Sequence, residues 1–287
     1  MHIRNGSTDA LITVLLMVLA AALGTGLAAC GGGGTTSACI AGQMVQIPAG
    51  LFRMGCSETV DPTCVGDDCP QISCQDDEFP FREVTLPAFE IDQCEVTVAS
   101  YQGCVVAKAC SEPSTYSGDC NWGVEGHGDH PINCIDWDQA SAFCAWAGKR
   151  LCTETEWEKA ARGGCEFYAD CKADSPEYPW PVDPPSCDKA VYLGCNCKGT
   201  CEVGIRPNGA SPYGVLDMAG NVWEWIQDTY HPSYDGAPDD GTSWEGGTNR
   251  MYRGGGWISK ETGLRVTNRV EYKADGLTDA LGFRCCK

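Results

Sequence analysis

Cysteine is the residue whose chemistry stands out in this chain, with 21 copies among 287 residues. At such a density cysteines either pair as disulfides in an oxidising compartment or hold a soft metal as thiolates. Spacing leaves the connectivity open, but Cys104 with Cys110, and the group Cys195, Cys197 and Cys201, are close enough in sequence for local loops. We expect a disulfide framework. A zinc or copper site at the second group is the alternative, although no histidine lies near it in the sequence.

Histidine gives a weaker signal. The chain has four histidines, His2, His127, His130 and His231, and none has the spacing of a zinc site. A Ser/His/Asp triad built on Ser259 and His231 would be chemically sound, but nothing in the sequence sets this pair apart from chance. The histidines therefore predict no catalytic centre.

The amino terminus resembles a processed leader. An apolar run from Leu11 to Leu23 is too short to span a bilayer and is typical of the core of a signal peptide. The tetrad Leu-Ala-Ala-Cys that ends at Cys30 reads as a bacterial lipobox, so cleavage there would leave a lipidated Cys30; an ordinary signal peptide with a chance cysteine is the alternative. Residues 31–37, GGGGTTS, have the composition of a flexible tether. The sequence predicts a signal peptide at 1–29, a lipid-anchored tether at 30–43 and one domain at 44–287.

The chain is strongly acidic, with 20 Lys and Arg against 39 Asp and Glu and a net charge of −19. The leader holds one charge of each sign, Arg4 and Asp9, so its removal leaves the net charge unchanged. Such a surface repels phosphate backbones and anionic headgroups, and we expect no nucleic-acid partner. The charge serves solubility; a calcium ion or a cationic partner is the more specific alternative. The lipobox and the cysteines together predict a lipid-anchored protein in the bacterial cell envelope, outside the cytoplasm.

Regular secondary structure is sparse. Asp136 with Gln139 forms a capping box before a helix that Gly148 ends, and Thr153 with Glu156 forms a second before a helix that runs to Arg162. Short apolar runs bounded by Gly, Pro or Asp predict strands. These are Glu83–Leu86, Phe89–Cys94, Met251–Trp257, Arg265–Val270 and Gly282–Cys285. A few helices with short strands and long loops indicate the α+β class.

A series of short motifs gives a sharper prediction than these elements do. In chain order they are Met44–Gly50 with Phe52, Met54 and Gly55, then Glu95–Thr97, Asp129–Pro131, Asp136–Trp137, Phe143–Leu151, Thr153–Glu158, Arg162–Gly164, Tyr178–Trp180, Pro207–Gly209, Ser211–Trp225, Tyr252–Trp257 and Leu281–Cys285. This order resembles the formylglycine-generating enzyme, or sulfatase-modifying factor, family over most of residues 44–286. The resemblance implies an irregular, C-type-lectin-like α+β domain with low regular content.

The family's known chemistry is not matched in one stretch. In the family, two cysteines five residues apart bind Cu(I) and oxidise a sulfatase cysteine to formylglycine; the matching positions here are Ser259 and Leu264. A small hydroxyl-bearing family residue three positions earlier is replaced by Gly256. Alcohols bind Cu(I) poorly and a hydrocarbon offers no lone pair, so we expect no copper. The sequence favours a non-catalytic module that binds a peptide, glycan or protein. The alternative is an oxidoreductase of the formylglycine-generating class with a non-standard active site.

The same resemblance implies a calcium site. The family's loop binds calcium through an amide side chain, two backbone carbonyls and a glutamate, and these positions map onto Asp217, Gly220, Val222 and Glu224. Such oxygen donors suit calcium, and Asp217 adds a negative charge where the family often has Asn. The alternative is that Asp217 caps the turn and Glu224 pairs with an arginine. We favour calcium.

Overall fold

The computed structural model describes residues 39–56, 74–171, 176–181, 183–195 and 197–287. The predicted lipidation site at Cys30 lies outside these residues. Within them the chain forms three α-helices, which are α1 (Val98–Val106), α2 (Trp137–Trp146) and α3 (Glu154–Arg162). None of the helices in these ranges is long and apolar enough to cross a membrane.

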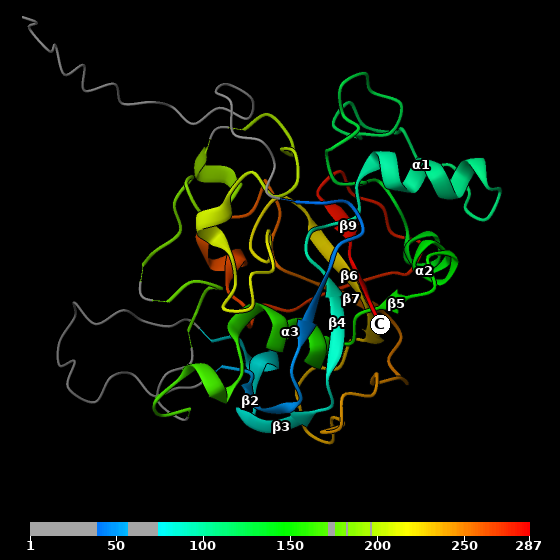
Figure 1. The fold of residues 1–287 in the computed structure, drawn as a ribbon. Helices are drawn as coiled ribbons and strands as arrows, with labels where there is room; N and C mark the ends of the chain where they lie inside the picture. Colours follow the sequence, from blue (N-terminus) through cyan, green and yellow to red (C-terminus); the bar gives the residue numbers. More distant parts are fainter. Residues whose placement is uncertain (1–38, 57–73, 172–175, 182, 196) are drawn as a thin grey trace, which may run out of the picture.

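Ten short strands form three separate sheets in the described ranges. The first sheet has the order β1 (Met44–Ile47), β4 (Phe89–Asp92), β10 (Cys285–Cys286) and β5 (Arg150–Leu151). The second pairs β2 (Gly50–Met54) with β3 (Arg82–Leu86). The third has the order β8 (Val270–Tyr272), β7 (Arg250–Arg253), β6 (Trp223–Thr229) and β9 (Leu281–Phe283), with β6 and β9 parallel. The last residues of the chain thus join two sheets, and the result is an irregular α+β domain (Figure 1).

The capping boxes predicted from the sequence are confirmed. The Asp136 side chain accepts a hydrogen bond from Gln139 N, the Gln139 side chain accepts one from Asp136 N, and α2 follows directly. Thr153 and Glu156 repeat this arrangement before α3, which ends at Arg162 as expected. Reciprocal capping satisfies two otherwise unpaired donors at each helix start, which is why a local pattern predicted both boundaries well.

The strand predictions are only partly correct. Met251–Trp257 was expected to be extended throughout, but β7 stops at Arg253 because Gly254 and Gly255 take left-handed conformations with φ of +96° and +78°. The strand expected at Arg265–Val270 is wrong over 265–269, where a turn at Val266 and Thr267 is flanked by irregular backbone; only Val270 is in a strand, β8. The sequence also gave no indication of β6, the longest strand in the described ranges.

Disulfides hold these short elements together. Eight bridges are present among the described residues, and the predicted Cys104–Cys110 loop is one of them. Cys195 pairs with Cys187, outside the group proposed from the sequence, so its sulfur is not a thiolate ligand. The two last cysteines bridge far back in the chain, Cys285 to Cys144 within α2 and Cys286 to Cys152, which directly precedes the N-cap of α3. The C-terminal strand is therefore fixed covalently to α2 and to the start of α3.

Loop length predicts that these bridges differ in strength. Replacing Cys144, Cys152, Cys285 and Cys286 together by Ala opens loops with sequence separations of 141 and 134 residues, whereas replacing Cys104 and Cys110 opens one of 6. All four cysteines are changed because either of the two bridges alone keeps the long loop closed. Loop-closure entropy gives a loss of at least about 5 kcal/mol for the long loop and about 2 kcal/mol for the short one. Denaturant unfolding of the quadruple and the double variant should show this order. Equal losses would mean that local packing, and not loop closure, sets the contribution of each bridge.

Candidate functional site

The segment from Asp217 to Glu224 forms a tightly curled loop that leads into β6. Asp217, Gly220 and Asn221 all have positive φ, at +56°, +93° and +64°. A side chain at Gly220 would meet the Val191 carbonyl oxygen at 2.4 Å, so only glycine fits there. The loop is held from both sides, because Gly220 N donates to Gly254 O at 2.9 Å and Asn221 N donates to Val191 O at 2.8 Å.

Asn221 and Glu95 fix the centre of this loop. The Asn221 side chain donates to Glu95 Oε2 at 2.6 Å and accepts from Cys201 N at 2.9 Å. Glu95 also accepts from Val222 N at 3.1 Å, so one carboxylate binds two consecutive loop residues. Glu95 is 2 % exposed and Asn221 1 %. The sequence placed Glu95 only near a helix start, and no local spacing could link it to a loop 126 residues away.

Glu224 is paired with an arginine. Arg284 makes a bidentate ion pair with it, at 2.7 Å to each carboxylate oxygen, and Trp157 Nε1 donates to Oε2 at 2.8 Å. The same Arg284 donates to the carbonyls of Leu216 and Asp92. The pairing offered as the alternative to calcium is thus present at Glu224. Asp217 accepts a hydrogen bond from Gly204 N at 2.6 Å, as a turn-capping carboxylate would.

The cluster nevertheless carries an excess of negative charge. Three buried carboxylates, Glu95, Asp217 and Glu224, surround the guanidinium of Arg284, and Asp217 is also influenced by a second arginine, Arg206. Burial, followed by the charges of Asp217 and Glu224, raises the pKa of Glu95 well above its usual range. Burial also raises the pKa of Asp217 to about 6, against the lowering effects of the Gly204 hydrogen bond and Arg284. Ionising all three groups is therefore costly unless a cation or a proton neutralises them.

The types of oxygen donor in this loop are those that calcium prefers. A hard divalent cation prefers carboxylate and carbonyl oxygens, and the excess charge beside Asp217 is what such a cation would neutralise. Asp217, Gly220, Val222 and Glu224 would supply the oxygens, with Glu224 shared with Arg284. Calcium at this position would stabilise the curled loop. The calcium site remains a prediction. Arg284, which pairs with Glu224, would compete with the cation for that carboxylate.

The positions that correspond to the copper cysteines do not fit copper. Ser259 closes a turn, with its Oγ accepting from Gly256 N at 2.9 Å. Leu264 is fully buried in an apolar cluster with Trp180, Tyr192 and Ala219 among its members. A side chain at Gly256 would lie only 3.0 Å from the Ala280 carbonyl oxygen and 3.1 Å from the Trp223 ring. Neither Ser259 nor Leu264 offers the thiolate that Cu(I) requires.

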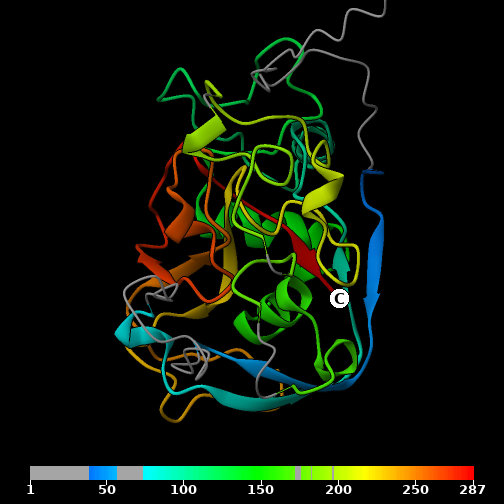
Figure 2. The same ribbon diagram turned by 90° about the vertical axis from the view of Figure 1, so that its left-hand side faces the viewer.

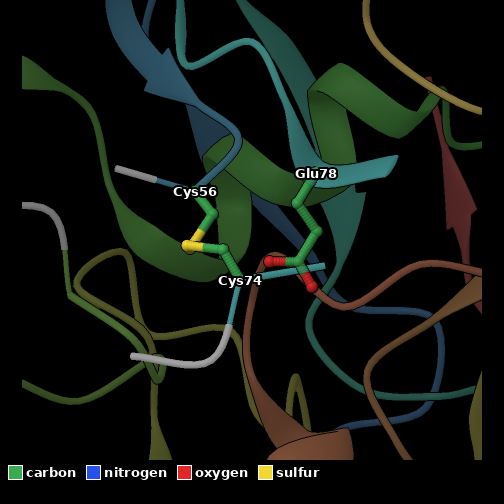
Figure 3. Close-up of side chains that lie close together, drawn as sticks. All are labelled: Cys56, Cys74 and Glu78. Atoms are coloured by element: carbon green, nitrogen blue, oxygen red, sulfur yellow. A yellow bond between two sulfur atoms is a disulfide. The ribbon is translucent and has the colours of Figure 1, made fainter. Parts of the chain in front are cut away.

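One cluster in the described ranges has the composition of a metal site, namely Cys56, Cys74 and Glu78. Figure 3 shows that the two sulfurs are joined as a disulfide, with the Glu78 carboxylate beside them. Glu78 makes a bidentate pair with Arg265, which neutralises its charge. Oxidised sulfurs and a neutralised carboxylate are poor ligands, so this cluster is structural.

The remaining candidate residues make packing contacts and turn hydrogen bonds. Ser259 bonds to Gly256, whereas the His231 ring stacks on Trp244 at 3.7 Å, so no contact joins these two members of the conceivable triad. His127 and His130 stack at 4.2 Å between rings, and burial, then the neighbouring His127, lowers the pKa of His130 to about 4. A stacked histidine pair in which burial favours the neutral form of His130 suits packing in this loop.

The fold and the curled loop at 217–224 are characteristic of one class of domain. A disulfide-rich α+β domain with short helices, little regular structure and a curled loop ahead of β6 is a C-type-lectin-like domain of the kind that sulfatase-modifying factors use. The chain belongs to the sulfatase-modifying factor family, because the family model described as "Sulfatase-modifying factor enzyme 1-like domain" matches residues 35–287.

Individual relatives include active and inactive enzymes. The chain is 30% identical to the formylglycine-generating enzyme of Thermomonospora curvata, with 86% of this chain and 93% of that protein covered. It is also 30% identical to "Inactive C-alpha-formylglycine-generating enzyme 2" of Bos taurus, with 85% and 87% covered. Among solved structures, PvdO from Pseudomonas aeruginosa has a TM-score of 0.68 at 29% identity and covers 85% of this chain and 93% of its own.

Replacing Asp217 by Asn in the curled loop removes the negative charge of this side chain and keeps its size and shape. The variant keeps an oxygen acceptor for Gly204 and removes a buried charge, so without calcium at pH 7.5 we expect it to be more stable than wild type by about 1–3 kcal/mol. With calcium at a hundredfold excess over Kd, the wild type should gain about 2.7 kcal/mol and the variant less, because its affinity is lower. Thermal unfolding with calcium and with a chelator measures both.

The matched control is Asp275→Asn at an exposed aspartate, which should change neither value. A melting temperature indifferent to calcium in the wild type would remove the calcium assignment. Destabilisation of Asp217→Asn in chelator would contradict the excess of negative charge.

Proposed function

We propose that this chain is a non-catalytic, lipid-anchored binding module of the bacterial cell envelope, built on the sulfatase-modifying factor fold. The observation that carries the proposal is the pair Ser259 and Leu264 at the positions that resemblance assigns to the copper cysteines. Their surroundings support it, because Leu264 is 0 % exposed and Ser259 closes a turn. Both side chains contribute to packing, and neither points into an open cleft.

The other cysteines give no replacement pair close to these positions in the sequence. Cys285 and Cys286, which follow Leu264, are both buried and bridged to Cys144 and Cys152. A disulfide sulfur does not bind Cu(I) as a thiolate does. The existence of relatives described as inactive shows that the family includes members of this kind. The alternative, an oxidoreductase with a non-standard site, would need a thiolate pair elsewhere.

Restoring the two cysteines tests the proposal directly. We expect the wild-type chain to bind no Cu(I) and to leave a Cys-x-Pro-x-Arg peptide unchanged in mass under dioxygen, because an alcohol and a hydrocarbon cannot hold the metal. The double variant Ser259→Cys, Leu264→Cys should bind one equivalent of Cu(I). The Leu264→Cys single variant is the control, since one thiolate binds Cu(I) less tightly. Peptide oxidation by the wild type, seen as a loss of about 18 Da from converting a thiol to an aldehyde, would favour the enzyme alternative.

The envelope location rests on the lipobox that ends at Cys30 and on the disulfides. Eight bridges among the described residues support an oxidising compartment. The ligand of the module is a peptide, glycan or protein, and the acidic surface disfavours nucleic acid.

Intact mass spectrometry of the native protein tests the anchor. We expect the mature chain to start at an acylated Cys30 and to fractionate with membranes, because the acyl chains partition into the bilayer. Cys30→Ser should release the chain into the soluble fraction. A native chain that starts elsewhere, together with unchanged fractionation of Cys30→Ser, would contradict the prediction.

A further inference from the structure

One side of the domain differs in charge from the rest. It is built from the start of the described chain (39–50), from α1 with its flanks (93–111) and from α2 with its C-terminal flank (137–153). Figure 1 shows the start of the described chain next to α1, and α1 and α2 together at one side of the molecule. In a chain with 39 acidic residues, these three segments contain two, the buried Glu95 and Asp138, which is exposed in the first turn of α2.

The basic residues of this face lie at its rim. Lys108 follows α1 and is exposed, and Lys149 and Arg150 follow α2. Lys149 pairs with Asp92 and Arg150 with Glu156, and the exposed Asp138 offsets Lys108, so the face is close to neutral. The rest of the protein surface is on average strongly negative, since the net charge is −19. An anionic surface would therefore be repelled least on this side.

Large apolar side chains are exposed on the same face. Ile40 is 68 % exposed, Val106 75 % and Trp146 45 %. The Trp146 ring lies against Gly103 of α1, where an added Cβ would be 3.5 Å away, so the ends of the two helices are neighbours. A cavity of about 270 Å³ opens at this place, and its lining includes Ile40, Phe143 and Trp146. Tryptophan next to lysine at the edge of an apolar surface is typical of a membrane–water interface.

The predicted anchor attaches to the domain at this face. Cys39 lines the cavity and is bridged to Cys94, which leads from β4 towards α1. Nine residue-to-residue steps lead from Cys30 to Cys39, and they can span at most about 32 Å when fully extended. A lipid on Cys30 would therefore keep this face close to the bilayer. The attachment point, the exposed apolar side chains and the near-neutral charge coincide.

We propose that the face formed by Ile40, Val106 and Trp146, with Lys108 and Lys149 at its rim, rests on the surface of the lipid bilayer. The proposal deepens the proposed function, because it depends on anchoring at Cys30 and adds the orientation of the anchored domain. The occupant is a bilayer that contains anionic headgroups, which Lys108 and Lys149 attract.

The orientation is tested on the acylated full chain in vesicles of phosphatidylethanolamine and phosphatidylglycerol. Hydrogen exchange should slow in residues 39–43, 100–108 and 143–149 relative to the Cys30→Ser chain in solution. The double variant Ile40→Ser, Trp146→Ser should lose this protection while it stays anchored by its lipid. The matched control is Leu193→Ser, Ile258→Ser, which alters two residues of similar exposure, 54 % and 47 %, elsewhere on the surface and should keep it.

A second measurement removes the anchor. The Cys30→Ser chain should still associate weakly with these vesicles in flotation, and adding Ile40→Ser, Trp146→Ser should lower the partition coefficient about tenfold. Circular dichroism and melting temperature verify that each variant is folded. Equal protection and equal partition in the variant and control chains would overturn the proposal.

Two further outcomes are informative. Protection of the same residues in concentrated Cys30→Ser protein without vesicles would assign the face to a second copy of the chain, and would also overturn the proposal. A native chain without acyl groups on Cys30 would instead contradict the anchor, while partition of the Cys30→Ser chain would still report on the face by itself.

Discussion

The buried ion pairs of α3 are the interaction on which the rest of the fold depends. All nine residues of this helix are buried, including two glutamates that face the core, Glu154 and Glu158. Arg253 pairs with both, and Arg269 makes a second, bidentate pair with Glu154 at 2.6 and 3.1 Å. An unpaired buried charge would be strongly destabilising, so α3 can occupy the centre only if β7 and the segment after it deliver these arginines. The helix and the C-terminal half therefore require each other.

This requirement explains why the segment 265–269 is not a strand. The carbonyl oxygens of Val266 and Thr267 accept hydrogen bonds from the Arg253 guanidinium, at 2.7 and 3.2 Å. Arg265 reaches Glu78, and Arg269 reaches Glu154. Side chains thus satisfy backbone groups that a sheet partner would otherwise bind, and a turn brings both arginines inward. A local pattern of β-branched residues cannot reveal this, because the partners lie more than 100 positions away.

The predictable parts of the molecule are those with local causes. Both capping boxes, the end of α3 and the short Cys104–Cys110 loop depend on residues at most ten positions apart, and all were correctly predicted. The order of the motifs identified the family and with it the lectin-like fold, which hydrophobic periodicity alone would not have indicated. Glu95 beneath the calcium loop, Arg284 on Glu224 and the bridges of the last two cysteines were not predicted. Each depends on a contact between distant segments, for which one sequence carries no signal.

The same long-range contacts explain how the fold persists with Ser259 and Leu264 at the positions assigned to the copper ligands. The curled loop is held by Glu95 and Gly254, and the start of β6 by Arg284 and Trp157, none of which depends on a thiolate at position 259 or 264. Leu264 instead fills an apolar cluster with Trp180 and Tyr192, where a polar or ionised group would be costly. Exchanging a reactive thiolate for a packed hydrocarbon removes a chemical function and adds buried apolar contact. The scaffold then keeps its loops and its outer faces, and these are the parts through which a binding module acts.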